Sequence, residues 1–162
     1  MTGATGRMIS EGDLLPRLTL GGAEGPRSAP WPGNLATVVV LVHPSPCDAC
    51  SAYLREIADA VDDLRAWGTQ VVSVTPDPAP DDLPFLVLGD EDGAGRRRLG
   101  VADATAAVLL ADRWGEVIEM ATTGSDHGFP LPRQLVESAK IVDVSCGECN
   151  VPGPEWRETD PV

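Results

Sequence analysis

Apolar residues recur along the chain at two spacings, one typical of buried strands and one typical of amphipathic helices. Residues 35–42 are largely β-branched and apolar on both faces, which indicates a central strand covered on each side. From Tyr53 to Trp67 apolar residues recur at helical spacing with charged residues between them, and Gly68 ends this helix. Residues 69–75 predict a second buried strand. A strand, helix and strand in this order nearly always make a right-handed parallel crossover, so the pattern predicts an α/β layer fold.

Shorter segments on both sides of this unit predict further elements. In chain order these are a strand at 14–20, a Pro/Gly-rich loop at 23–33, a short strand or extended segment at 85–88, a helix from an Asp90 cap through Leu99, and a hairpin of 106–111 with 117–122. A last helix begins at Pro130 or Pro132. Five of its residues are expected to face the core: Leu131, Leu135, Val136, Ala139 and Val142.

The length of 162 residues suits one hydrophobic core rather than two. Small and polar residues at 1–12 predict a flexible leader, and residues 13–145 carry all of the predicted elements. Residues 146–162 form a C-terminal extension that contains a Cys-x-x-Cys pair and a tail. The apolar fraction of 43% and the charged fraction of 23% are those of a globular protein in water.

The charge of the chain limits its partners. Twenty-five acidic residues against 12 basic ones give a net charge of −13, which opposes the approach of nucleic acid or an anionic membrane surface. The longest apolar run, 35–42, is far below the ~20 residues that a membrane span requires. The first fifteen residues lack the basic start and apolar run of a secretory signal, so we expect a cytoplasmic protein that neither inserts into a membrane nor binds nucleic acid.

All four cysteines belong to two Cys-x-x-Cys pairs, of which Cys47 and Cys50 form the first. This pair lies between the central strand and the first turn of the helix, where free backbone N–H groups and the positive helix end stabilise a thiolate. One helical turn of separation lets the second sulfur close a disulfide with the first. Asp48 opposes the thiolate and predicts a less oxidising couple. Two other interpretations stay open: half of a metal site, or inert core packing.

The second pair, Cys146 and Cys149, follows the last helix and lies in a loop by its Gly and Pro content. It can act as a relay dithiol for Cys47/Cys50, as a metal knuckle that holds zinc, or as a passive disulfide or unused thiols. Among the histidines, His43 ends the central strand, where it can tune the nearby thiolate or serve as a buried, hydrogen-bonded residue. His127, in the loop before the last helix, is expected to be a surface residue, with a ligand role beside the C-terminal cysteines as the weaker alternative.

Several segments of the chain resemble the thioredoxin-like superfamily and, more narrowly, the AhpC/TSA (peroxiredoxin-like) redoxins. The resemblance runs from about Gly12 to about Cys149. The segments that carry it are Gly12–Pro16, the central strand leading to Cys47-Asp48-Ala49-Cys50, Phe85–Gly93 followed by Leu99-Gly100-Val101, and Val108–Val117. It implies a three-layer thioredoxin-like fold, with a central mixed sheet of four to six strands flanked by helices, and thiol chemistry at the first pair.

The first pair fits the families within this superfamily in two registers. Aligned on the Pro-x-x-x-Thr-x-x-Cys run of peroxiredoxins, Cys50 takes the peroxidatic position and Cys47 replaces the threonine. The stretch 105–107 lacks both the arginine of peroxiredoxins and the cis-proline of thioredoxins. In the thioredoxin register Cys47 attacks and Cys50 resolves, and we prefer this register because the threonine and the arginine are missing.

We therefore predict an enzyme, a thiol–disulfide oxidoreductase whose catalytic residues are Cys47 and Cys50, with electron relay to the second pair as an added step. It requires no cofactor. Its partners are a protein or small-molecule disulfide and a dithiol reductant, and both monomer and oligomer stay open. The alternatives are a thioredoxin-fold accessory or binding protein whose cysteine pairs hold zinc or another metal, and a peroxidase that uses Cys50.

Overall fold

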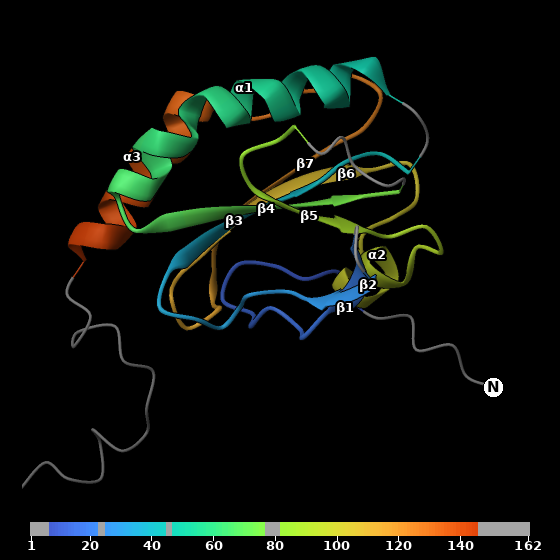
Figure 1. Cartoon of the computed structure of the whole chain (residues 1–162), viewed down its shortest axis with the longest axis horizontal. Helices are drawn as coiled ribbons and strands as arrows, with labels where there is room; N and C mark the ends of the chain where they lie inside the picture. The colour runs from blue at the N-terminus through green and yellow to red at the C-terminus, as the bar shows by residue number, and fades with distance from the viewer. Residues whose placement is uncertain (1–6, 23–24, 45–46, 77–81, 146–162) are drawn as a thin grey trace, which may run out of the picture.

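The computed structural model describes residues 7–22, 25–44, 47–76 and 82–145 (Figure 1). Within these ranges seven strands form one mixed sheet in the order β2-β1-β5-β4-β3-β6-β7. The strands are β1 (Thr19–Gly22), β2 (Gly25–Ser28), β3 (Ala36–Leu41), β4 (Thr69–Thr75), β5 (Leu86–Gly89), β6 (Ala106–Ala111) and β7 (Val117–Thr123). The helices are α1 (Asp48–Ala66), α2 (Ala94–Leu99) and α3 (Pro132–Val144).

The centre of the sheet is β3, whose six residues are all buried. It pairs in parallel with β4 on one side and antiparallel with β6 on the other. The predicted crossover from β3 through α1 to β4 is therefore present, and so is the hairpin of β6 and β7. β3 ends at Leu41 and α1 begins at Asp48, which places the first cysteine pair beyond the carboxyl edge of the sheet.

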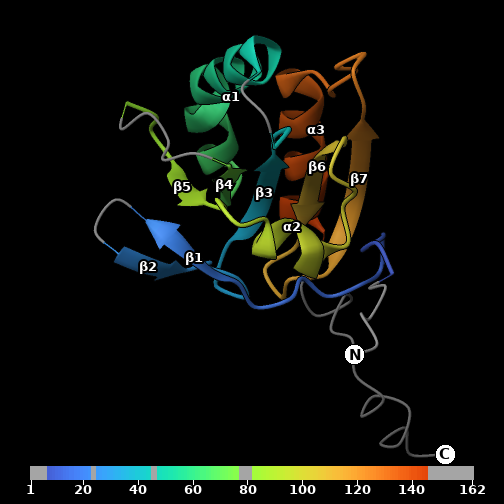
Figure 2. The same cartoon turned by 90° about the vertical axis from the view of Figure 1, so that its right-hand side faces the viewer.

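Helices α1 and α3 lie side by side on one face of the sheet (Figure 2). The expected apolar face of α1 is buried there from Tyr53 to Leu64, against alternate residues of β3. In α3 Leu135 and Ala139 are buried, and Val136 and Val142 are partly buried against the same core, as expected. The expectation that Leu131 faces the core is wrong: it stands just before the helix and is 47% exposed, because a residue at the helix cap lies outside the helical face.

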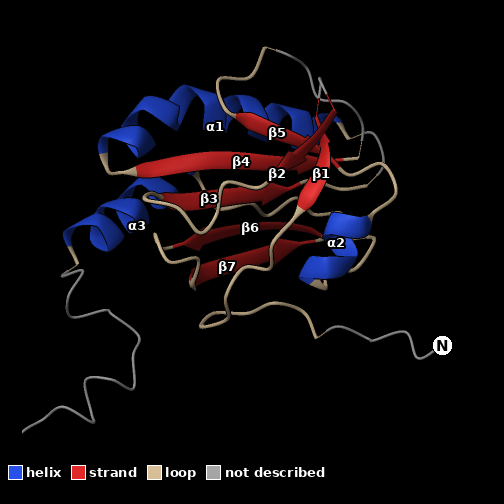
Figure 3. Cartoon of the chain, turned by 60° about the horizontal axis from the view of Figure 1, so that its bottom comes forward, coloured by secondary structure: helices blue, strands red, loops and turns tan. Residues whose placement is uncertain are grey.

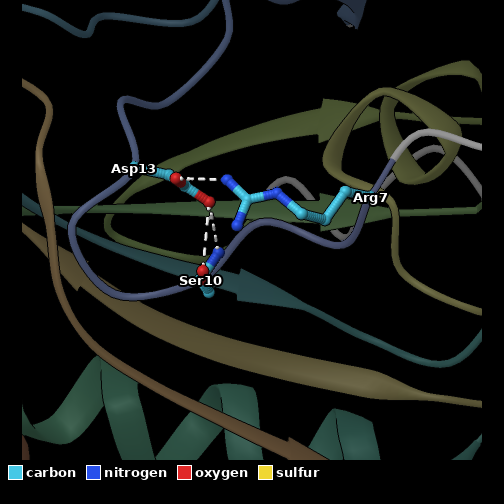
Figure 4. A network of polar contacts seen from close by, with 3 residues as sticks. All are labelled: Arg7, Ser10 and Asp13. Carbon is cyan, nitrogen blue, oxygen red and sulfur yellow. Dashed lines mark hydrogen bonds and ion pairs between the residues drawn. The ribbon is translucent and has the colours of Figure 1, made fainter.

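The opposite face of the sheet is covered by α2 and by the N-terminal segment (Figure 3). Residues 7–12, part of the predicted leader, lie against this face, with Ile9 buried and its N–H donating to the carbonyl of Leu99 at 3.1 Å. Asp13 closes the turn that follows, accepting from the Ser10 backbone N–H at 2.9 Å and pairing with Arg7 at 2.7 Å (Figure 4). The core therefore has two halves, one on each face of the sheet.

Three local features differ from the sequence analysis. The sheet has seven described strands rather than four to six, because β1 and β2 form a hairpin partly within the expected Pro/Gly-rich loop. The strand expected at 14–20 starts at Thr19. Helix α2 begins at Ala94, although Asp90 still accepts the backbone N–H groups of its first turn. None of the helices in the described ranges has the length and apolar character needed to cross a bilayer.

Candidate dithiol site

Cys47 is the residue that caps the N-terminus of α1. Its backbone is extended, and its Sγ accepts a hydrogen bond from the backbone N–H of Cys50 at 3.4 Å. The first-turn amides and the positive end of a 19-residue helix therefore act on this sulfur. The side chain is half-buried, so a substrate can reach it.

The imidazole of His127 contacts the same sulfur, although the two residues are far apart in sequence. Its Nε2 lies 3.0 Å from Cys47 Sγ. His127, expected to be a surface residue, is half-buried, and the loop between β7 and α3 that carries it folds back over the start of α1 and brings it to Cys47. His127 has a φ of +50°, the left-handed conformation, which turns the chain at this point. No local pattern in the sequence signals the contact.

Helix α1 holds the loop that carries His127. The hydroxyl of Tyr53, one turn beyond Cys50, donates to the carbonyl of Pro130 at 2.7 Å. The Tyr53 ring stacks on Phe129 with centroids 4.2 Å apart and planes within 9°. The same helix therefore supplies the cysteines and fixes the position of the imidazole.

Cys50 and His43 form a second, more deeply buried pair. Their exposed fractions are 3% and 8%, and His43 Nδ1 lies 3.1 Å from Cys50 Sγ. His43 was expected to tune the thiolate of Cys47 or to be a buried strand-end residue; the structure places it just beyond β3, against the other cysteine. Its Nε2 is buried and has no hydrogen-bond partner among the described residues.

The two thiols ionise differently. Partial burial acts to raise the pKa of Cys47, but the backbone and side-chain hydrogen bonds of Cys50 and the contact with His127 act against it, and the resulting pKa is below its ordinary value of 9.0. Burial raises the pKa of Cys50 to about 11. Cys47 is therefore the sulfur that ionises more readily, and Cys50 is held as a thiol.

Comparisons with known proteins address the fold that carries this pair. No protein-family model matches the chain, and no curated protein matches it. Among solved structures the chain is similar to AhpC of Mycobacterium tuberculosis, with a TM-score of 0.68 and 18% identity over 88% of this chain and 99% of that one. It is also similar to a thiol:disulfide interchange protein DsbE of Chlorobium tepidum, with a TM-score of 0.65 and 22% identity over 83% of this chain and 98% of that one. A third similar structure is peroxiredoxin Q of Xanthomonas campestris, with a TM-score of 0.66 and 14% identity over 83% of this chain and 99% of that one.

The chain has a thioredoxin-like fold. The resemblance to redoxins inferred from the sequence is thus confirmed at the level of the fold, with a mixed sheet and flanking helices. Within this thioredoxin-like fold the dithiol lies at the edge of the sheet where β3 gives way to α1. Residues 105–107, which face this edge at the start of β6, contain no proline and no arginine.

An arginine nevertheless reaches this region of the thioredoxin-like fold from α2. Arg96 is 3% exposed, and its guanidinium donates to the carbonyls of Val42, Ala102 and Thr105, the contact with Ala102 measuring 2.9 Å. It ties the end of β3 to the start of β6 beneath the cysteines. Burial lowers the pKa of Arg96. Sequence reasoning missed this residue, because it sought an arginine in the stretch before β6 and not on the preceding helix.

The structure brings some of the candidate residues together and leaves others apart. Asp48 is exposed in the first turn of α1. Cys146 and Cys149 lie outside the described residues. By contrast, the ligand atoms of His43, Cys47, Cys50 and His127 all lie within 4.8 Å of one another. Two histidines and two cysteines from three segments of the chain thus form one cluster.

Proposed function

We propose that the protein is a thiol–disulfide oxidoreductase in which Cys47 is the nucleophile and Cys50 the resolving cysteine. Its substrate is a protein or small-molecule disulfide, and a dithiol reductant returns the pair to the reduced state. The observation that carries the proposal is the contrast between the two sulfurs. One caps a helix beside an imidazole and is half-exposed, and the other is buried one turn later.

The first step is attack by the Cys47 thiolate on one sulfur of the substrate. A Cys47–substrate disulfide forms, the substrate S–S bond breaks, and the leaving sulfur departs with the electron pair as a thiolate. The Nε2 of His127, at 3.0 Å from the attacking sulfur, contacts the thiolate before attack and is placed to pass a proton to the leaving group.

The second step releases the substrate. Cys50 gives its proton to Nδ1 of His43, and its sulfur attacks Cys47 Sγ. The Cys47–Cys50 disulfide forms and the second substrate sulfur leaves as a thiolate that takes up a proton. The substrate has gained two electrons and two protons, and the cysteine pair has lost them. His43 is needed because a thiol with a pKa raised to about 11 is not a nucleophile at neutral pH until its proton is removed.

A peroxidase that uses Cys50 is less well supported by this geometry. Attack on a peroxide requires an accessible thiolate, whereas Cys50 is 3% exposed and its pKa is raised. The guanidinium of Arg96 donates three of its N–H groups to backbone carbonyls, so most of its donors are already occupied. We therefore place the nucleophile at Cys47.

The test compares cysteine variants in a disulfide reduction assay with insulin, in the presence of a metal chelator. We expect Cys47→Ser to abolish the reaction. We expect Cys50→Ser to lose turnover while accumulating a mixed disulfide on residue 47, which mass spectrometry detects. A Cys47→Ser variant that reduces insulin as fast as the parent contradicts the assignment.

The double variant Cys146→Ser/Cys149→Ser tests the proposed relay. If the second pair passes electrons to the first, the double variant keeps the first half-reaction, reduction of one equivalent of substrate, but is recharged more slowly by its reductant. Equal recharging rates with and without the second pair contradict the relay and leave the function of Cys47 and Cys50 intact. The same variant is the background for the metal experiments below.

A further inference from the structure

The cluster of His43, Cys47, Cys50 and His127 has more donors than disulfide exchange needs. Thiol–disulfide exchange requires the two cysteine sulfurs of the protein, and it does not require a separate base beside each of them. Here each sulfur has its own imidazole nitrogen at 3.0 or 3.1 Å, and all four donor atoms fall within 4.8 Å. Two sulfur and two nitrogen donors converging on one point are the donor set of a tetrahedral metal centre.

The distances suit a single small ion. Bonds of about 2.3 Å to sulfur and about 2.0 Å to nitrogen give a tetrahedron with edges of about 3.3–3.8 Å. The two sulfur–nitrogen contacts of 3.0 and 3.1 Å need to open by about half an ångström to reach these edges, and the longest donor–donor separation, 4.8 Å, needs to close by about 1 Å. The two imidazole rings meet edge to face, with centroids 4.8 Å apart and planes at 71°, so they can occupy neighbouring corners without stacking.

The chemistry of the donors and the charge of the site favour a borderline-soft divalent cation. Two thiolates and two neutral imidazoles around Zn²⁺ make a neutral centre, which is the form that a partly buried location tolerates. Carboxylates, which Mg²⁺ and Ca²⁺ prefer, are absent from the cluster.

The four donors are carried by elements that already bring them together. Cys47 and Cys50 lie on one helical turn, and His43 follows the central strand. His127 stands on the loop that Tyr53 holds by a hydrogen bond and by stacking. Such support keeps ligands in position before the metal arrives, which raises affinity.

We propose that His43, Cys47, Cys50 and His127 form a mononuclear tetrahedral binding site for Zn²⁺. On binding, both thiols release their protons to solvent and two Zn–S bonds form, with no change in oxidation state. The proposal stands on the geometry of the four side chains and does not require the oxidoreductase activity. If that activity is present, the bound ion occupies both sulfurs and blocks it reversibly.

The experiment uses the reduced, full-length Cys146→Ser/Cys149→Ser chain, so that no other cysteine can bind metal. Zn²⁺ is titrated against a chromophoric chelator, and Co²⁺ is added as a spectroscopic probe. We expect one ion per chain, and for Co²⁺ the intense visible bands of tetrahedral coordination together with thiolate-to-metal charge transfer. Cys47→Ser or Cys50→Ser should remove the charge-transfer band in large part and lower Zn²⁺ affinity by more than about 100-fold.

Histidine variants separate this site from simple binding by a Cys-x-x-Cys pair. We expect His127→Asn and His43→Gln each to lower Zn²⁺ affinity at least about tenfold and to shift the Co²⁺ bands, while the exposed α1 variant Glu56→Gln leaves both unchanged. His127→Asn is the decisive variant because asparagine tolerates the left-handed backbone there, so the chain should stay folded, as circular dichroism can check.

Three outcomes overturn the site: no stoichiometric Zn²⁺ binding, weak octahedral Co²⁺ bands, or an affinity that is the same in both histidine variants as in the parent. The insulin assay in the presence of chelator is scored separately. If metal binding fails and insulin reduction is intact, only the proposed Zn²⁺ site is contradicted. If metal binding is present and insulin reduction fails, only the proposed oxidoreductase activity is contradicted.

Discussion

Cys47 and Cys50 have identical side chains in different electrostatic surroundings. The difference can be measured as the pH dependence of the rate at which each thiol is alkylated. The pKa of Cys47 is lowered by hydrogen bonds and by His127, whereas burial raises that of Cys50 to about 11. A thiol reacts with an alkylating agent as the thiolate, so its rate rises with pH up to its pKa. In metal-free protein we expect the midpoint for Cys47 to lie below 9.0 and that for Cys50 near 11, measured by mass spectrometry of iodoacetamide labelling across a pH series.

The same titration isolates the part played by His127. In His127→Asn the imidazole is gone, so the midpoint for Cys47 should rise, because one of the groups that stabilise its thiolate is lost. Arg55→Gln, which removes an exposed positive charge from the middle of α1, is the matched control and should leave the midpoint where it was. Equal midpoints in the parent and His127→Asn would show that helix amides alone set the pKa.

At the scale of elements, one buried side chain on α2 joins two strands under the site. Arg96 supplies N–H groups to three backbone carbonyls, of which that of Ala102 also accepts from the Thr105 N–H. We expect Arg96→Met to lower the free energy of unfolding by at least about 3 kcal/mol, because buried acceptors lose their charged donor. Arg97→Met on the same helix removes an exposed arginine that donates to the Asp92 carbonyl, and should cost about 1 kcal/mol or less. Urea denaturation measures both, and similar values would contradict the role of Arg96.

The end of α2 also fixes the N-terminal segment to the domain. Gly100 has a φ of +68°, and a Cβ there would lie 2.7 Å from Met8 Cα and 2.8 Å from the carbonyl oxygen of Arg7. Gly100→Ala should therefore destabilise the fold by more than about 1–2 kcal/mol, the cost of the left-handed backbone alone, and speed tryptic cleavage after Arg7. Gly124→Ala, where a Cβ meets nothing within 4 Å, is the control and should change stability by less than about 0.5 kcal/mol. If the two variants are equally stable, residues 7 and 8 do not pack as described.

For the whole molecule, the net charge of −13 bears on which disulfides can approach Cys47. Charged substrates feel this field, and salt screens it over about 8 Å at physiological ionic strength. We expect the cationic disulfide cystamine to react faster than oxidised glutathione, which is anionic. Added salt should slow the first reaction and speed the second, as stopped-flow measurement of the exchange rate can show. The neutral hydroxyethyl disulfide should respond little to salt. A salt dependence of the opposite sign would show that a local positive field outweighs the net charge.

The amino-acid sequence was sufficient to predict the layers of this molecule and the placement of two residues of the candidate site. The buried runs of β3 and β4 and the helical spacing between them specify the crossover through period and hydrophobicity, which are local properties. The position of Cys47 and Cys50 between strand and helix follows from the same local patterns. The tertiary structure alone decided the rest. His127 and Arg96 reach the edge of the sheet from distant segments, and their roles depend on how β7, α2 and α3 pack, because contacts between residues far apart in the chain leave no periodic mark in it.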